Sequence, residues 1–141
     1  MKTSARNMFV GQISSIRQGM VVCEVELTTS SGLKIVSAIT KESLETLGLA
    51  QGKTVTATVK APWVVLVKDG KDVKTSARNR FCGKISAISK GMVAVEVVVD
   101  LPDGTKVTSL ITDGSATSMD LKVGDEICAL VKAFSVILTV E

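Results

Sequence analysis

The chain has 141 residues, 45% of them hydrophobic, with 17 Lys and Arg against 14 Asp and Glu and a formal net charge of +3. Because this positive excess is small and unclustered, a polybasic surface for nucleic acid or anionic lipid is not expected. His and Tyr are both absent, which excludes a Ser-His triad, an imidazole general base and imidazole metal ligands.

An internal repeat organises the whole chain. The segment Lys2–Asn7 returns unchanged as Lys74–Asn79, and the same offset of 72 positions holds without a gap as far as Asp69 and Glu141. Of the 68 aligned pairs, 30 are identical, so the sequence predicts two copies of one small module. The expected boundaries are 1–68 for the first domain, 69–73 for a short polar linker and 74–141 for the second domain.

Each module is expected to begin with three strands. The first strands are predicted at 7–16 and 79–88, and the third strands at 33–39 and 105–111, after turns at Ser30–Gly32 and Pro102–Gly104. Between the first and third strands of each module, hydrophobic residues alternate with period two, which predicts a half-buried second strand. The residues expected on the buried face are Val21, Cys23, Val25 and Leu27 in the first copy and Val93, Val95, Val97 and Val99 in the second.

A short helix and a broken strand complete each module. Thr40–Leu47 is predicted as a helix with Thr40 as N-cap and Gly48 after its end, and Thr112–Met119 is its weaker counterpart. The final strands, 54–60 and 63–67, are interrupted at Ala61–Pro62. These elements predict an all-β fold of two tandem OB-like small β-barrels, each with one short helix. An irregular sandwich of the same strands is the alternative.

The rest of the composition indicates a cytoplasmic protein that forms an oligomer. Met1 leads straight into the first repeated segment, so no secretory signal is expected. The longest apolar run, Ala61–Val67, is much shorter than the roughly 20 residues that span a bilayer. Modules of this size are marginally stable alone, so the surplus apolar surface is expected between modules and between chains.

Three cysteines are present, and none is duplicated. Cys23, Cys82 and Cys128 align with Val95, Val10 and Thr56 of the other copy. A disulfide framework or a repeated metal site is therefore not expected. The cysteines are interpreted as buried, unpaired small hydrophobic residues in a reducing compartment.

The repeated polar residues are mainly hydrogen-bond donors. They include Arg6, Lys60 and the hydroxyls of Ser4, Thr40 and Ser43, with no Asp or Glu among them. If these groups converge, they suit a ligand made of acceptors with negative charge, such as a tetrahedral oxyanion. Thr40 and Ser43 lie at a predicted helix N-terminus, which also favours an anion. The lack of a carboxylate acceptor disfavours a protonated anion such as monohydrogen phosphate.

Structural roles for the same residues stay open. Ser4–Asn7 can form a turn with Asn7 as its local hydrogen-bonding residue, Lys60 can be a solvated strand residue, and Thr40 a plain cap. Glu24 and Glu96 are repeated on a mixed strand face, where a solvent-facing or interface charge is expected. Phe9 and Phe81 are expected in the core or an interface.

Two other function classes are less compatible with the sequence. OB folds often bind single-stranded nucleic acid on aromatic platforms, but the chain has only four Phe and Trp residues. An enzyme that used Lys60 or a cysteine as nucleophile would lack a partner base. An OB-fold nucleic-acid-binding module therefore remains the alternative, and no enzymatic activity is expected.

The combination of Thr-Ser-Ala-Arg-Asn opening each module, Ile-Thr in its middle and Val-Lys-Ala-Pro-Trp-Val near the first module's end resembles the molbindins. These are Mop-type molybdate- and tungstate-binding domains, and the chain is similar to their tandem, di-Mop form. The resemblance implies OB-like barrels, a cytoplasmic role in storage and homeostasis of molybdenum, and homotrimers of two-domain chains that form rings of six domains with anions at domain interfaces. It implies no cofactor, no catalytic residue, no bare metal cation, no nucleic acid and no membrane partner. Because no helix-turn-helix precedes residue 2, the role of a related transcriptional repressor is not expected.

By the same resemblance, molybdate or tungstate is held by two equivalent sets of residues. In the first copy these are Ser4, Ala5, Arg6, Asn7, Thr40, Ser43, Lys60 and Ala61, and in the second they are Ser76, Ala77, Arg78, Asn79, Thr112, Ser115, Lys132 and Ala133. The alanines are expected to act through backbone N–H groups. The second copy departs from the pattern at Phe134–Ser135, where the first has Pro62–Trp63, and Arg80 is a charge without a counterpart.

Overall fold

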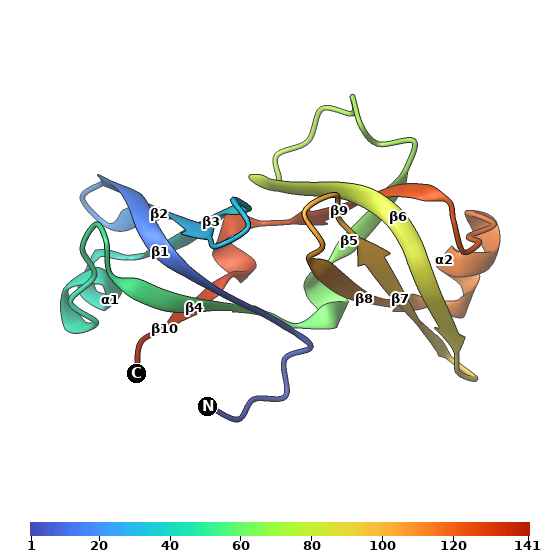
Figure 1. Ribbon diagram of the computed structural model, residues 1–141, viewed down its shortest axis with the longest axis horizontal. Helices are drawn as coiled ribbons and strands as arrows, with labels where there is room; N and C mark the ends of the chain where they lie inside the picture. Colours follow the sequence, from blue (N-terminus) through green and yellow to red (C-terminus); the bar gives the residue numbers. More distant parts are fainter.

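The computed structural model describes all 141 residues and contains two five-stranded antiparallel sheets (Figure 1). Their strand orders are β10-β4-β1-β2-β3 and β5-β9-β6-β7-β8. The elements of the first repeat are β1 (Asn7–Gln18), β2 (Val22–Thr29), β3 (Lys34–Thr40), α1 (Lys41–Thr46), β4 (Thr54–Val59), the 3-10 turn η1 (Ala61–Trp63) and β5 (Val65–Lys68). Those of the second are β6 (Asn79–Lys90), β7 (Ala94–Asp100), β8 (Lys106–Thr112), α2 (Asp113–Ser118), β9 (Glu126–Val131), η2 (Ala133–Ser135) and β10 (Ile137–Thr139).

The two repeats exchange their last strands. β5 leaves the first repeat and pairs with β9, with Val65 opposite Leu130, while β10 returns to pair with β4, with Ile137 opposite Thr58. Figure 1 shows β10 in the lobe that holds β1–β4, beside the second lobe. The turns η1 and η2 cause the exchange because they break each strand and direct its continuation into the neighbouring sheet.

Because of this exchange, the predicted boundaries divide the sequence into repeats but do not divide the structure into separate sheets. Residues 1–68 and 74–141 are units of sequence, but neither forms a complete sheet, since each sheet contains a strand of the other repeat. Two buried hydroxyls hold the crossing segments. Ser37 donates to the carbonyl of Val136 and Ser109 to that of Val64, both at 2.7 Å. One hydrophobic cluster of 26 buried residues accordingly includes side chains of both repeats.

Both predicted helices form at the expected places. The Thr40 hydroxyl accepts from the backbone N–H of Ser43 at 3.1 Å, and Thr112 does the same for Ser115. Gly48 has a φ of 60° directly after the first helix, the left-handed conformation that ends helices with little cost at glycine. The weaker second pattern is a complete helix in the structure, α2.

The alternating residues of β2 and β7 lie in the core as predicted, except for one residue at each hairpin. The buried face predicted for the second strand is confirmed from Cys23 to Leu27 and from Val95 to Val99, all with no exposed surface. Val21 and Val93, by contrast, are 72% and 79% exposed. Both lie at the tip of a hairpin, just before their strands begin. They are therefore outside the sheet, although the alternation in the sequence includes them.

The cysteine prediction is wrong for two of the three residues. Cys23 is buried and free, as expected, but Cys82 and Cys128 form a disulfide. They are direct partners in the register of β6 and β9. Comparison of the repeats gave no signal for this pair because it exists in one copy only, and the contact depends on strand register, which spacing does not reveal.

No helix of the structure is long and apolar enough to cross a bilayer.

Candidate functional site

A cavity of about 480 Å³ lies between the start of the second repeat and the first hairpin of the first repeat. It combines predicted site residues with residues outside the predicted site. The predicted ones are Ser76, Arg78, Lys132 and Ala133, and the others are Arg17, Gln18, Gly19, Val22, Glu24, Ala38 and Phe134. Three side chains in this set are basic and one is acidic, so the cavity carries a local positive charge.

Strand pairing brings the distant predicted residues together. Asn79, the first residue of β6, lies opposite Val131, the last residue of β9. Arg78 and Lys132 are the next residues beyond these paired ends, so the register places them side by side although they are far apart in sequence. The first repeat has the same register, with Asn7 opposite Val59, which places Arg6 beside Lys60.

Arg6 and Arg78 are each paired with a glutamate of the other repeat. Arg6 donates from Nη1 and Nη2 to the two carboxylate oxygens of Glu96 at 2.7 and 3.2 Å. Arg78 donates from Nη1 to Glu24. Glu24 and Glu96 are therefore interface charges, one of the two roles expected for them.

This pairing corrects the inference that no carboxylate accompanies the donors. The donor set looked free of acids because the glutamates lie on another strand, and only the contact between the repeats places them on the arginines. A guanidinium has five N–H donors, and the contacts with Glu24 occupy only part of those of Arg78. The remaining donors are available to a second anion, while the glutamate fixes the orientation of the group.

Asn7 and Asn79 bridge the two repeats instead of facing the cavity. The Asn79 side chain donates to the carbonyls of Val36 and Val131 at 2.8 and 3.2 Å and accepts from the Val36 N–H at 2.8 Å. Asn7 makes the equivalent three bonds to Val59 and Thr108. Both side chains are almost fully buried. Their amides act as hydrogen-bonded links between the sheets and are not parts of a local turn.

The hydroxyls at the helix N-termini are engaged in capping. Thr40 donates from its hydroxyl to that of Ser43 at 2.9 Å, and Thr112 does so to Ser115 at 2.8 Å. None of these four residues lines the cavity within the chain. Thr40 is, however, exposed at the end of β3, which contributes Ala38 to the cavity wall, and Thr112 is exposed at the end of β8.

The predicted alanines fall into two groups. The N–H groups of Ala5 and Ala77 donate to the hydroxyls of Thr3 and Thr75 at 3.2 and 3.3 Å, so these segments form small turns stabilised by side chains. Ala61 and Ala133 are buried at the starts of η1 and η2, and only Ala133 lines the cavity described here. Ser4, like Ser76, is exposed next to its arginine.

The two copies differ most clearly at their lysines. Lys60 Nζ lies 5.8 Å from the ring centroid of Trp63, within the range of a cation–π contact. Ser135 occupies the corresponding position in the second copy, and Phe134, which is 69% exposed, lines the cavity beside Lys132. Trp63 thus has a role in the first copy alone.

The hairpin residues Arg17, Gln18 and Gly19 were missed by sequence reasoning because they belong to the other repeat. The repetition of Glu24 as Glu96, together with that of Arg6 as Arg78, was the available signal of a coupled pair. No group of three or more Cys, Asp and Glu side chains has the geometry to hold a metal ion.

The sequence matches a known domain family and several curated proteins. A family model described as TOBE domain matches residues 3–66 and 75–138. The molybdenum transport protein ModE of Azotobacter vinelandii is 41% identical over 140 residues, covering 99% of this chain and 52% of that protein. The molybdenum-pterin-binding protein MopA of Rhodobacter capsulatus is 37% identical over 138 residues, covering 98% and 52%. The chain thus spans about half the length of these curated relatives.

A solved structure resembles the chain over its full length. The cytoplasmic molybdate-binding protein ModG, crystallised with molybdate bound, superposes with a TM-score of 0.94 at 42% identity, and the match covers 100% of both chains. Two tandem OB-like domains and the exchanged strands therefore occur within a fold that is already known.

Proposed function

The chain belongs to the TOBE domain family, and from this premise we propose that it is a cytoplasmic binding protein for molybdate and tungstate that stores and buffers molybdenum. The observation that carries this proposal is the convergence of Ser76, Arg78 and Lys132 on one cavity. The full-length likeness to a molybdate-binding protein supports it.

The cavity has the charge that a dianion requires. Arg17, Arg78 and Lys132 supply three positive charges and Glu24 one negative charge, which leaves a local charge of +2. The anion exchanges its hydration shell for charge-assisted hydrogen bonds, each roughly twice as strong as a neutral bond. Because Glu24 already holds Arg78 in place, less side-chain freedom is lost when the anion binds. Selection against sulfate, also a dianion, depends mainly on cavity size.

A neighbouring chain completes the site in this proposal. The cavity is bordered by Gly19, and the next residue, Met20, is 94% exposed; Met92 in the second copy is 99% exposed. Two apolar hairpin tips of this kind favour an interface. In a homotrimer, contacts at these tips would cover the cavity and bring the exposed Thr40 or Thr112 of another protomer toward the anion.

The alternative of a nucleic-acid-binding module has less support. Phe9 and Phe81, the only repeated aromatic residues, are buried in the core, so they provide no stacking platform. We assign no reaction to the site, because its residues include donors and one paired carboxylate but no nucleophile with an adjacent base.

Calorimetric titration with molybdate tests the proposal. Arg78→Ala or Lys132→Ala removes a charged hydrogen bond of roughly 1.5–3 kcal/mol, so binding at the second-copy site should weaken on the order of tenfold to a hundredfold. Lys122→Ala is the matched control, since this exposed lysine pairs only with Asp120 and lies outside the cavity. Equal affinity of Arg78→Ala and wild type would refute the assignment of this cavity.

A further inference from the structure

Several features unique to the second repeat meet in one place that the proposed site does not use. Arg80, Cys82 and Cys128 replace Met8, Val10 and Thr56 of the first repeat. All three lie on the paired strands β6 and β9. The linker between the repeats, residues 69–73, folds over the same strands.

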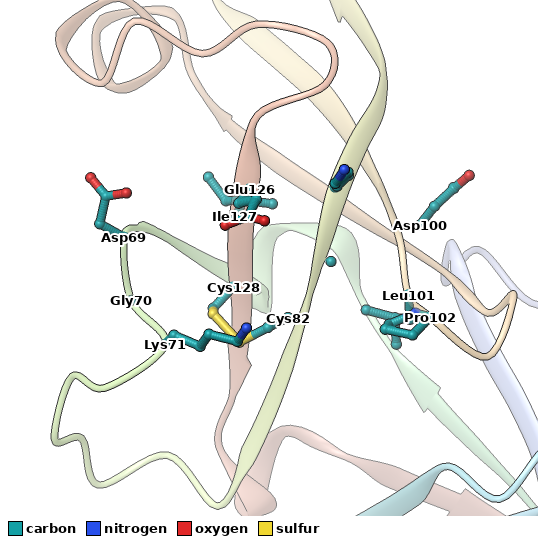
Figure 2. A pocket seen from close by; sticks show the side chains of 12 residues that line it. Asp69, Gly70, Lys71, Cys82, Asp100, Leu101, Pro102, Glu126, Ile127 and Cys128 are labelled. Atoms are coloured by element: carbon teal, nitrogen blue, oxygen red, sulfur yellow. A yellow bond between two sulfur atoms is a disulfide. The ribbon is translucent and has the colours of Figure 1, made fainter.

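Arg80 attaches the linker to the sheet. Its guanidinium donates to the carbonyls of Gly70 at 3.2 Å and Lys71 at 2.5 Å, and also to that of Val73. Beneath the linker is a cavity of about 510 Å³ whose wall includes the Cys82–Cys128 disulfide (Figure 2). Cys82 is partly exposed, whereas Cys128 is 3% exposed. A small molecule in this cavity therefore reaches the disulfide from the side of Cys82.

The disulfide joins the two strands that present the proposed oxyanion site. Cys82 lies four residues after Arg78 on β6, and Cys128 lies four residues before Lys132 on β9. The covalent link thus fixes the separation of the strand ends from which both ligands extend. In the first repeat, Val10 and Thr56 face each other at the same register without a link, so Arg6 and Lys60 depend on hydrogen bonding and packing alone.

We propose that Cys82 and Cys128 form a thiol–disulfide exchange site for a small peptide thiol, and that their oxidation state sets the anion affinity of the second-copy site. The coupling rests on the proposed function, whereas the exchange site does not. The cavity wall carries both signs of charge, from Lys71 and Lys84 and from Asp69, Asp100 and Glu126. This arrangement suits a zwitterionic thiol with free carboxylate and ammonium groups.

The exchange is balanced without a further reactant. The thiolate of the small molecule attacks Cys82 Sγ, the S–S bond breaks, and its electron pair leaves on Cys128 Sγ, which takes up a proton. A second small thiol attacks the small-molecule sulfur of the mixed disulfide and releases Cys82 as a thiol. Two small thiols are oxidised to one disulfide, and the protein disulfide is reduced to two thiols.

The test uses the full-length chain equilibrated with defined ratios of glutathione to glutathione disulfide. Alkylation followed by mass measurement reports how many cysteines are reduced. The oxidised and reduced proteins are then freed of small thiols and titrated with molybdate in a calorimeter. We expect Cys82 and Cys128 to become alkylated together, Cys23 to stay protected in the fold, and reduction to weaken one class of site on the order of fivefold, at the low end of coupling between sites.

Two matched variants isolate the cause. Cys82→Val with Cys128→Thr installs the residues of the first repeat and should bind like the reduced protein at every glutathione ratio. Val10→Cys with Thr56→Cys places a pair at the equivalent register and should make the first-copy site respond as well.

The outcomes separate the two proposals. Cys82 and Cys128 that remain alkylable under oxidising ratios would overturn the exchange site. Identical molybdate titrations of oxidised and reduced wild type, both of which bind, would overturn the coupling. Absence of molybdate binding in both states would refute the proposed function and the coupling with it, while alkylation would still decide the exchange site.

Discussion

Replacing Asn79 with Ala tests whether this residue links the repeats or binds the anion. The substitution removes three buried hydrogen bonds and leaves the N–H and C=O of Val36 without their side-chain partner. Each unsatisfied buried polar group costs about 1–3 kcal/mol, so for these two groups we expect a loss of roughly 2–6 kcal/mol in the free energy of unfolding. That is a large fraction of the 5–15 kcal/mol typical of folded domains.

Urea unfolding followed by circular dichroism at fixed protein concentration measures this loss. Asn79→Asp should be at least as harmful, because a carboxylate would face the carbonyls of Val36 and Val131 in a buried position. Gln12→Ala, an exposed change on β1, is the control and should stay within about 0.5 kcal/mol of wild type. An Asn79→Ala protein with wild-type stability but without anion binding would refute the structural role and return Asn79 to the set of ligands.

Further outcomes follow from the charges and exposed surfaces. Light scattering should give a mass three times the 14.8 kDa of one chain, and a monodisperse monomer at micromolar concentration would contradict completion of the site by a neighbour. Arg78→Lys should bind molybdate more weakly than wild type but better than Arg78→Ala in calorimetry, since a point charge replaces only part of a planar fork; equal affinities of Arg78→Lys and wild type would argue against directed hydrogen bonds. Molybdate affinity should survive 1 M sodium chloride, where the Debye length is about 3 Å, whereas an open basic surface would lose its anion. Hydrogen bonds from Ser31 and then Thr105 lower the pKa of Asp103, so its stabilising contribution is complete above the ordinary aspartate pKa and is lost as the pH falls through the lowered value. Ser31→Ala should shift the Asp103 carboxyl titration, followed by NMR, back toward the ordinary value, and an unchanged titration would contradict the assigned cause.

Local patterns in the sequence predicted the elements well. The repeat and the alternation from Cys23 to Leu27 defined the strands, and Thr40 with Gly48 defined a helix whose caps the structure contains. These features depend on neighbours within a few residues, so they can be read along the chain. Pairing between distant segments was harder to predict from the sequence. The apolar residues of β5 have the same alternation whichever sheet they join, and for this reason the strand exchange had no sequence signal.

The candidate site was predictable to the extent that it follows strand register. Once β6 pairs with β9, Arg78 and Lys132 must lie together, as their repetition suggested. The ion pair between Glu24 and Arg78 is a contact between the repeats, so residue spacing within one repeat could not predict it. Asn79 was assigned to the anion through the resemblance to the molbindins, whereas burial of its amide against backbone groups gives a structural reason for its repetition.

The most direct test of the proposed oxyanion site is a crystal structure of the protein grown with molybdate, with data collected across the molybdenum absorption edge. The anomalous signal locates each anion without assumptions about its ligands. We predict a peak within hydrogen-bond distance of the Arg78 guanidinium and the Lys132 ammonium, in the cavity beside Glu24, and an equivalent peak beside Arg6 and Lys60. Anomalous peaks found only away from these residues, or none at saturating molybdate, would contradict the assignment of the oxyanion site.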